Sequence, residues 1–194
     1  RFLDVIVLRT GKDENLRELA KWSTVPVING LTPVSHPIQI LADVLTFEEH
    51  RGPITGKTLA WIGDGNNVAT SLMEAAALLK FNVRLATPTG FAPSERAVRW
   101  ARENGASIEI FHDPAEAVAG ADAVLTDTWV SMGDKDREER LEAFRPYQVD
   151  AALMAKAAPE ALFLHCLPAH IGEEVTADVF ESPASVVFDE AENR

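Results

Sequence analysis

The sequence predicts an α/β fold, in which a doubly wound, mostly parallel sheet of the Rossmann-like kind carries helices on both faces. Short apolar runs alternate with segments whose apolar residues recur at helical spacing, which is typical of βαβ units. Gly, Pro, Asn or Asp stands at most of the borders between them. With 46% hydrophobic residues among 194, the chain has enough apolar material to cover both faces of such a sheet.

The apolar runs are the expected strands. The first of them ends at Arg9 and resembles a short buried strand more than a signal peptide. In chain order, strands are expected at Asp4–Arg9, Val25–Asn29, Thr58–Ile62, Asn82–Thr87, Ser107–Phe111, Ala123–Thr128, Ala161–His165 and Ser185–Phe188.

Helices are expected between these strands. Proline in the first turn indicates one start after His36 and another after Asp113. The expected apolar face of the first is Ile38, Leu41, Ala42 and Leu45. A helix beginning at Asn67 has Val68, Leu72, Met73, Ala76 and Leu79 on one face, and a further helix lies between Pro93 and Gly105.

A candidate domain boundary lies in the segment 50–57, which contains Gly and Pro between two apolar patterns. The residues before it are too few to bury a core of their own, whereas those after it suffice for a complete doubly wound unit. We therefore expect residues 1–50 to be the remnant of a preceding α/β domain and residues 51–194 to form the second domain.

Charge and cysteine content exclude several classes of protein. The 18 Lys and Arg residues against 30 Asp and Glu give a net charge of −12 without a basic cluster, which disfavours nucleic acids and anionic membranes as partners. The single cysteine, Cys166, cannot form an internal disulfide or a cysteine-rich metal site. No stretch approaches the ~18 apolar residues of a membrane helix. We expect a soluble, cytoplasmic protein.

In open α/β sheets, ligands bind beyond the carboxyl ends of the strands, so the residues there are the candidates for chemistry. The strand ending at Ile62 is followed by Gly-Asp-Gly-Asn-Asn, which begins like a dinucleotide fingerprint but has Val68 at the third glycine position. The next strand ends without the acid that holds a ribose, which argues against a nicotinamide cofactor. Asn66 is interpreted as a helix N-cap or a ligand, and Asn67 as the better ligand candidate.

Other strand ends carry an acid, a thiol and guanidinium groups. Asp127 suits an ammonium group, or else a turn. Cys166 lies beside a proline turn, where it contacts a substrate or fills the core, and His165 is expected to be a core histidine. Arg9 and Arg194 each follow an expected strand and suit an oxyanion.

The helix start His36-Pro37-Ile38-Gln39 places an imidazole and an amide one turn apart. Such a pair can hold a carbonyl oxygen and an amide, although a solvent-exposed first-turn histidine is the simpler alternative.

Taken in order, these elements resemble the carbamoyltransferase family over essentially the whole chain. The resemblance rests on His-Pro-Ile-Gln at 36–39, Gly-Asp-Gly-Asn-Asn at 63–67, the segment 127–133, His-Cys-Leu-Pro at 165–168 and Glu-Ala-Glu-Asn-Arg at 190–194. The Ser-Met-Gly of the segment 127–133 is similar to the ornithine-specific rather than the aspartate-specific members. Residues 1–50 would then be the C-terminal part of a carbamoyl-phosphate domain, and residues 51–194 an ornithine-binding domain.

The resemblance implies roles for individual residues. It implies that carbamoyl phosphate is bound by Arg9, His36, Gln39, Cys166, Leu167 and Arg194. It implies that ornithine is bound by Asn67, Asp127, Ser131 and Met132, with Arg9, His36, Asp127 and Cys166 catalytic. The implied reaction transfers a carbamoyl group to the side-chain amine and yields citrulline and phosphate without a metal or cofactor. The implied assembly is a homotrimer that shares its active sites.

The family's phosphate-binding Ser-Thr-Arg-Thr does not occur in this sequence, so we expect the chain alone to be inactive. The alternatives are a non-catalytic ornithine-binding fragment, a carbamoyltransferase for a related amine, and a Rossmann-type oxidoreductase.

Overall fold

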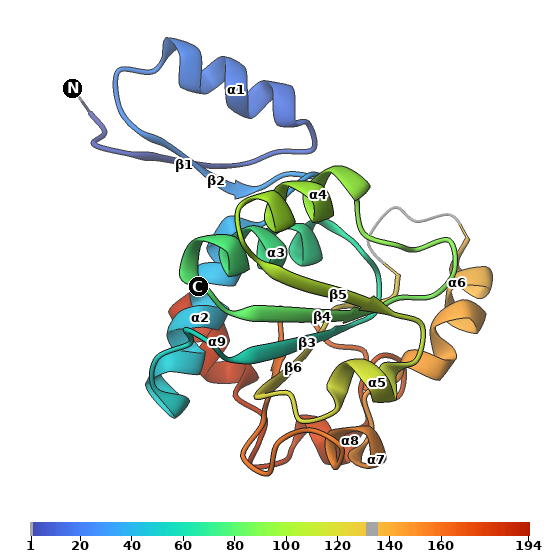
Figure 1. Ribbon diagram of the computed structural model, residues 1–194. Coiled ribbons are helices and arrows are strands. Elements are labelled where there is room, and N and C mark those ends of the chain that lie inside the picture. Colours follow the sequence, from blue (N-terminus) through green and yellow to red (C-terminus); the bar gives the residue numbers. More distant parts are fainter. Residues whose placement is uncertain (1, 131–135) are drawn as a thin grey trace.

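The computed structural model describes residues 2–130 and 136–194 (Figure 1). Its strands are β1 (Ile6–Arg9), β2 (Val27–Leu31), β3 (Thr58–Ile62), β4 (Asn82–Ala86), β5 (Ser107–Phe111), β6 (Ala123–Thr126) and β7 (Leu162–His165). Its α-helices are α1 (Asp13–Trp22), α2 (Pro37–Arg51), α3 (Asn67–Leu79), α4 (Glu95–Glu103), α5 (Pro114–Val118), α6 (Arg137–Phe144), α7 (Ala151–Met154), α8 (Ala177–Phe180) and α9 (Val187–Asn193). A 3₁₀ turn, η1, covers Arg145–Tyr147.

The larger sheet is parallel, with the strand order β5-β4-β3-β6-β7. The chain adds β4 and β5 on one side of β3 and then returns to add β6 and β7 on the other, which is the doubly wound order. Ile62 pairs with Thr126, and Thr126 pairs with His165, so β3, β6 and β7 end side by side. The predicted fold class is confirmed.

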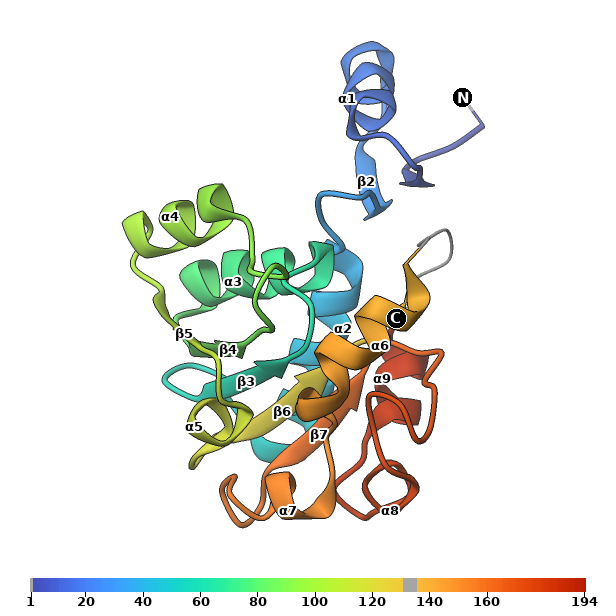
Figure 2. The ribbon, with the colours of Figure 1, turned by 90° about the vertical axis from the view of Figure 1, so that its right-hand side faces the viewer.

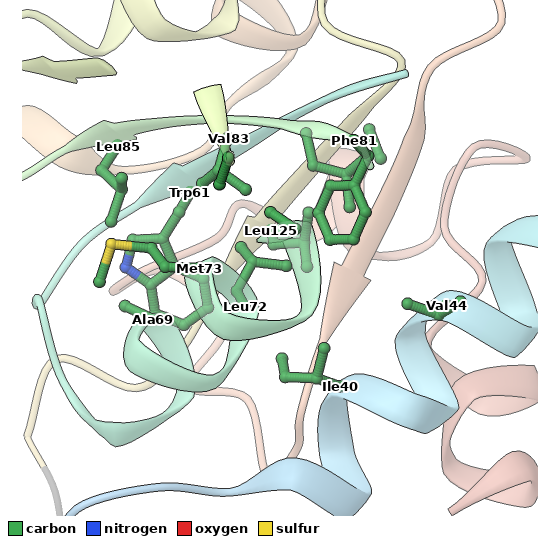
Figure 3. Packing of buried hydrophobic residues seen from close by; sticks show 14 of the residues in the cluster. Ile40, Val44, Trp61, Ala69, Leu72, Met73, Phe81, Val83, Leu85 and Leu125 are labelled. Carbon is green, nitrogen blue, oxygen red and sulfur yellow. The ribbon is translucent and has the colours of Figure 1, made fainter. Parts of the chain in front are cut away.

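Apolar side chains cover both faces of this sheet because neighbouring residues of a strand point to opposite sides. On one face, Trp61 of β3 and Phe81 pack against Leu72 and Met73 of α3 (Figure 3). Apolar residues of α2 and α4 belong to the same cluster. The opposite face is covered by α5, α7 and α8, as Figure 1 shows. The periodic apolar positions that predicted α3 are buried except for Leu79.

Strands β1 and β2 form a separate parallel pair with α1 beside it. This β1-α1-β2 unit stands away from the larger sheet, and the chain runs from β2 into α2 (Figures 1 and 2). Two bonds tie the connection to α3: the Asn67 amide donates to the Thr32 carbonyl at 2.8 Å, and the backbone N–H of His36 donates to the Ser71 hydroxyl at 2.8 Å.

The apolar face predicted for α2 is wrong in part. Leu41 and Leu45 are exposed, whereas Ile40, Val44 and Phe47 enter the main core. The helix is rotated in this way because its polar residues Gln39, Asp43 and Thr46 are also buried, toward α9 and the carboxyl ends of the strands. Helix α2 thus lies before the expected domain boundary and packs in the core that follows it.

The strand predicted at Ser185–Phe188 is also wrong. Ser185 forms one isolated parallel bridge with Phe163, and the chain then turns into α9. The Glu190 N–H bonds the Val186 carbonyl at 2.9 Å, which begins the helix after a single paired residue. Arg194 therefore follows a helix and not a strand.

Among the described residues, no helix is both long and apolar enough to cross a membrane. The strands predicted at Thr58–Ile62 and Ser107–Phe111 are confirmed with the same bounds, as β3 and β5. The strand predicted at Val25–Asn29 lies two residues later, at Val27–Leu31, whereas β1, β4, β6 and β7 are each one or two residues shorter at one end than predicted.

The burial of Phe47 predicts that α2 stabilises the larger domain. Phe47→Ala removes a side chain that is 0% exposed, so we expect the free energy of unfolding to fall by about 3–5 kcal/mol. The matched control is Leu41→Ala on the exposed side of the same helix, for which we expect a change of about 0.5 kcal/mol or less. Urea unfolding followed by circular dichroism measures both. Equal losses for the two variants would contradict this packing.

Candidate functional site

The candidate site lies at the edge where β3, β6 and β7 end. Asn66, Asp127 and Cys166 come from three separate loops, and the parallel register brings these loops together. The Asn66 amide donates to one Asp127 oxygen at 2.8 Å, and the Cys166 thiol donates to the other at 2.9 Å. The structure therefore brings the predicted acid and thiol into direct contact.

The thiol of Cys166 is held in its protonated form. Burial raises its pKa well above the usual range, and the charge and hydrogen bond of Asp127 raise it further, followed by the charges of Asp43 and Glu190. At neutral pH Cys166 is therefore a hydrogen-bond donor and not a thiolate nucleophile.

The two neighbouring asparagines have separate tasks. The Asn66 side-chain oxygen accepts from the backbone N–H groups of Val68 and Ala69 at 2.9 and 3.2 Å, so Asn66 is the N-cap of α3. Its amide nitrogen orients Asp127 at the same time. The Asn67 amide is bonded to the Thr32 carbonyl, which leaves one of its two N–H hydrogens for another acceptor.

His36 lies directly before α2, as predicted, and it is buried, so the alternative of a solvent-exposed histidine is wrong. Its pKa is lowered to about 4 by burial and by the positive charges of Arg194 and Arg9, against a smaller opposing effect of Asp127. The imidazole is therefore neutral at neutral pH. No described residue forms a hydrogen bond with its buried Nδ1, so a polar atom is left for a ligand.

Gln39 and Arg194 meet beside the same edge. One Arg194 nitrogen donates to the Gln39 side-chain oxygen at 2.8 Å and to the Cys166 carbonyl at 2.5 Å. Both Arg194 and Arg9 are exposed, and both are near enough to His36 to affect its pKa. The predicted cluster of basic and amide groups is thus formed around His36.

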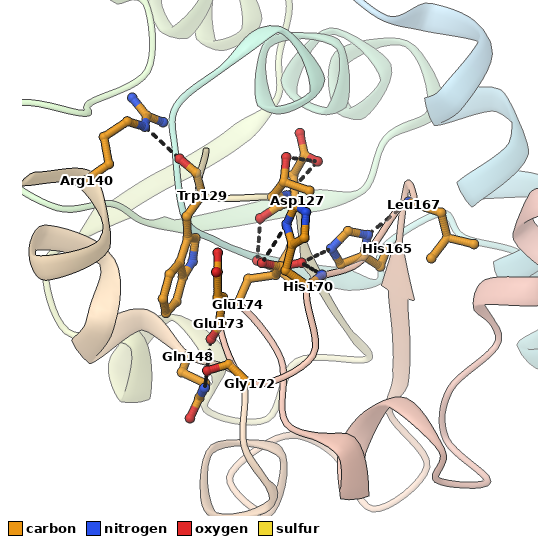
Figure 4. Close-up of polar contacts among 12 residues, drawn as sticks. Asp127, Trp129, Arg140, Gln148, His165, Leu167, His170, Gly172, Glu173 and Glu174 are labelled. Carbon is orange, nitrogen blue, oxygen red and sulfur yellow. Dashed lines mark hydrogen bonds and ion pairs between the residues drawn. The ribbon is translucent and has the colours of Figure 1, made fainter. Parts of the chain in front are cut away.

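His165 is a bonded core histidine, as expected. Its Nδ1 accepts the backbone N–H of Leu167 at 2.9 Å, so the proton is on Nε2, which donates to Glu174 at 3.1 Å (Figure 4). Both side chains are fully buried. Glu174 fixes the ring of His165, and the ring in turn bonds the backbone of Leu167. Leu167 has a positive φ of 49° and precedes a cis proline.

Three buried acids were missed by sequence reasoning: Asp43, Glu174 and Glu190. Asp43 had a weak signal, since it lies one helical turn after Gln39 and the two side chains bond at 2.7 Å. Glu174 and Glu190 look like ordinary surface acids in the sequence, because the residues that bury them are distant in the chain.

The Gly-Asp-Gly loop is closed against another loop. A Cβ at Gly65 would lie 2.2 Å from the backbone nitrogen of Pro93, and the Gly65 N–H donates to the Phe91 carbonyl at 2.9 Å. This glycine is needed for the approach of the protein's own backbone and not of a pyrophosphate. The arrangement agrees with the argument against a dinucleotide.

Among the described residues, one group has metal-ligand chemistry: His170, Glu173 and Glu174, whose ligand atoms lie within 4.8 Å of one another. One oxygen of each glutamate is bonded within the protein: Arg137 bonds Glu173 at 2.5 Å, and the backbone N–H of His170 bonds Glu174 at 2.5 Å (Figure 4). The other oxygen of each is buried and forms no hydrogen bond with a described residue. Ser131 and Met132, which were expected to bind ornithine, lie outside the described residues.

Comparisons with known proteins agree with the geometry. The model of the aspartate/ornithine carbamoyltransferase Asp/Orn binding domain matches residues 55–194, and that of the carbamoyl-P binding domain of the same family matches residues 1–49. The ornithine carbamoyltransferases of Brucella abortus (strain 2308) and Rhizobium meliloti (strain 1021) are 61% and 56% identical to the chain over all 194 residues. The chain spans 62% and 64% of their lengths.

Solved structures of similar proteins have the same fold. The ornithine carbamoyltransferase from Pyrococcus furiosus superimposes with a TM-score of 0.93 at 50% identity, covering 99% of this chain and 63% of the other. The anabolic ornithine carbamoyltransferase from Campylobacter jejuni gives 0.92 at 37% identity, with coverage of 99% and 65%.

The contact between Cys166 and Asp127 predicts the reactivity of the thiol. Asp127→Asn removes the charge that raises the pKa of Cys166, so the thiolate fraction at pH 8 should rise. We expect alkylation by iodoacetamide to become about tenfold faster, the effect of one pKa unit. The rate is measured by intact mass, which is unambiguous because the chain has one cysteine. Asp178→Asn, at an exposed acid, is the control; the same acceleration there would contradict a local effect of Asp127.

Proposed function

Because the chain belongs to the aspartate/ornithine carbamoyltransferase family, we propose that it takes part in the transfer of a carbamoyl group from carbamoyl phosphate to the side-chain amine of L-ornithine. The products are L-citrulline and phosphate. The same site serves the forward or the reverse reaction, so both synthesis and breakdown of citrulline fit this proposal.

We assign the two ends of the site to the two parts of the chain. Residues 1–50 contribute to the binding of carbamoyl phosphate, and residues 51–194 bind ornithine. The matched ranges of the two family models, 1–49 and 55–194, support this division. In keeping with the family resemblance, we also propose a cytoplasmic homotrimer as the working assembly.

The observation that carries the proposal is the contact between Asp127 and Cys166 at the carboxyl edge of the sheet. A carboxylate there attracts the side-chain ammonium of ornithine, and the protonated thiol beside it keeps the carboxylate oriented. Asn67, at the N-terminus of α3, holds the amino-acid carboxylate, for which the helix dipole is favourable. Ser131 and Met132 complete this end of the site by resemblance.

Arg9, His36, Gln39 and Arg194 bind carbamoyl phosphate in this proposal, with Cys166 and Leu167 between the two substrates. The clustering of Gln39, Arg194 and the Cys166 backbone supports it, as does the unbonded Nδ1 of the buried His36. The two kinds of donor have different roles in this proposal. The charged guanidinium groups attract the phosphate, whereas the neutral imidazole of His36 donates a hydrogen bond to the carbamoyl oxygen.

The reaction requires the ornithine amine to lose a proton and attack the carbamoyl carbon. Negative charge then develops on the carbamoyl oxygen, and donors from Arg9 and His36 stabilise it. The C–O bond to phosphate breaks as the C–N bond is completed. The nitrogen loses two protons in all, one from the ammonium before attack and one as the C–N bond is completed. One passes to the departing phosphate and the other through Asp127 to solvent, since Cys166 is already protonated.

The assignment of Asp127 predicts a loss of ornithine binding. Asp127→Ala removes a charge-assisted hydrogen bond, so we expect binding to weaken by about 2–3 kcal/mol, or about 30- to 150-fold. Isothermal titration of the 194-residue chain with L-ornithine measures it, with lysine, putrescine and aspartate as competing candidates. Asp178→Asn is the surface control.

An unchanged ornithine dissociation constant in Asp127→Ala would remove Asp127 from the site. Tighter binding of one of the other compounds would contradict ornithine as the substrate.

A further inference from the structure

Two buried carboxyl groups converge on a single amide beside the proposed site. The Gln39 side-chain nitrogen donates to Asp43 at 2.7 Å and to Glu190 at 2.5 Å. Asp43 comes from α2 and Glu190 from α9, and their exposed fractions are 3% and 2%. The same Glu190 accepts the backbone N–H of His165 through its other oxygen at 2.9 Å.

The positive charge nearby does not neutralise both acids. Among the described residues, Arg194 forms no ion pair with either carboxyl, since it bonds the Gln39 oxygen and the Cys166 carbonyl. The other charged group that affects Asp43 is Asp127, which is also an acid. Asp43 and Glu190 line a small cavity together with the apolar side chains of Trp61, Val68, Leu125 and Leu164, and its other lining residues are Thr126, His165 and Cys166. Two adjacent negative charges in such surroundings repel strongly, as in a carboxyl dyad that shares one proton.

We propose that Asp43 and Glu190 share a proton and, through their common bonds to Gln39, are positioning residues that keep the oxygen of its amide turned toward the substrate site. An amide turned by 180° would direct its oxygen at two acids and its N–H groups at Arg194. The carboxyl pair therefore selects one orientation. In that orientation the amide oxygen of the buried Gln39 faces Arg194 and the proposed substrate site as an acceptor, which suits the N–H₂ of a carbamoyl group and not the methyl of an acetyl group.

This inference rests on the proposed function for the identity of the ligand, but the shared proton rests on the structure alone. Burial raises the pKa of Asp43 to about 7, against the lowering effects of Glu190, Gln39 and Arg194. Burial and the charge of Asp43 raise the pKa of Glu190 well above its usual range. Of the neighbouring groups, the pKa of His36 is lowered to about 4 and that of Cys166 is raised, so neither changes charge near neutral pH. The buried pair of His165 and Glu174 lies next to Glu190, and the Asp43→Asn variant separates its effect from that of the carboxyl pair.

The chain allows a direct test because Gln39 and Gln148 are its two glutamines. With glutamine labelled by ¹⁵N in the side chain, nuclear magnetic resonance shows one pair of N–H signals for each. We expect the Gln39 signals to shift with pH, with a midpoint near 7. Gln148 donates to the backbone carbonyls of Gly172 and Glu173 and is the internal control. The Gln39 shift should vanish in Asp43→Asn, which keeps an acceptor, and persist in Asp189→Asn, at an exposed acid on α9.

Gln39 signals that are independent of pH between about 5 and 9, or that titrate unchanged in Asp43→Asn, would overturn the shared proton. Asp43→Leu removes the acceptor, and we expect faster hydrogen exchange of the Gln39 amide; exchange as slow as in the unsubstituted chain would overturn the positioning role. Should that variant not fold, Asp43→Asn still tests the shared proton, on which the proposal depends.

Ligand addition separates this inference from the proposed function. Carbamoyl phosphate at pH 7 should move the Gln39 signals, and acetyl phosphate should move them much less. If the Gln39 signals shift with pH but respond to neither compound, the shared proton is supported and the assignment of Gln39 to the carbamoyl-phosphate site is contradicted. An equal response to both would overturn the selection of an acceptor orientation.

A second readout is stability. Because folding raises the pKa of Asp43, the folded chain binds this proton more tightly than the unfolded chain, and the free energy of unfolding falls as pH rises from about 4 to about 7. Asp43→Asn should flatten this part of the curve, measured by urea unfolding at a series of pH values. An identical pH dependence in both proteins would count against the inference.

Discussion

The parallel alignment of β3, β6 and β7 is the constraint on which the rest of the molecule depends. Since Ile62, Thr126 and His165 are in register, the three loops that follow them begin at one edge. The Thr126 hydroxyl strengthens this alignment by donating to the Ile62 carbonyl at 2.6 Å. A slip of one residue in β6 would turn the side chains of this strand to the opposite faces of the sheet and withdraw Asp127 from Asn66 and Cys166.

The polar groups at this edge are maintained by one another rather than by solvent. Asn66 caps α3 and orients Asp127, and Asp127 holds the thiol of Cys166. Glu190 accepts from Gln39 and from the backbone of His165, which joins α2, α9 and β7. Burying a polar group without a hydrogen bond lowers the free energy of unfolding. Each of these residues offsets that loss for its neighbour by forming a hydrogen bond with it. The helices contribute as much to this arrangement as the sheet does.

The sequence was informative wherever a local rule decided the structure. Asn66 before a periodic segment predicted the start of α3, and Asp113-Pro114 predicted that of α5. Ser185–Phe188 was misread because a β-branched, aromatic run favours a strand, whereas contacts of Glu190 and Asn193 with α2 stabilise a helix. The burial of Glu190 had no comparable signal, since its partner Gln39 is 151 residues away in the chain. Long-range contacts of this kind have no period and no local motif.

The bond from Asn67 to Thr32 also gives the chain a form of thermodynamic linkage. The Asn67 side chain belongs to the α3 end of the site, and Thr32 directly follows the β1-α1-β2 unit. If a ligand competes with the Thr32 carbonyl for this amide, its binding energy is reduced by the loss of that contact. A shift of the β1-α1-β2 unit that draws Thr32 away would remove the competition and tighten binding. By reciprocity, ligand binding would favour the shifted arrangement by the same free energy.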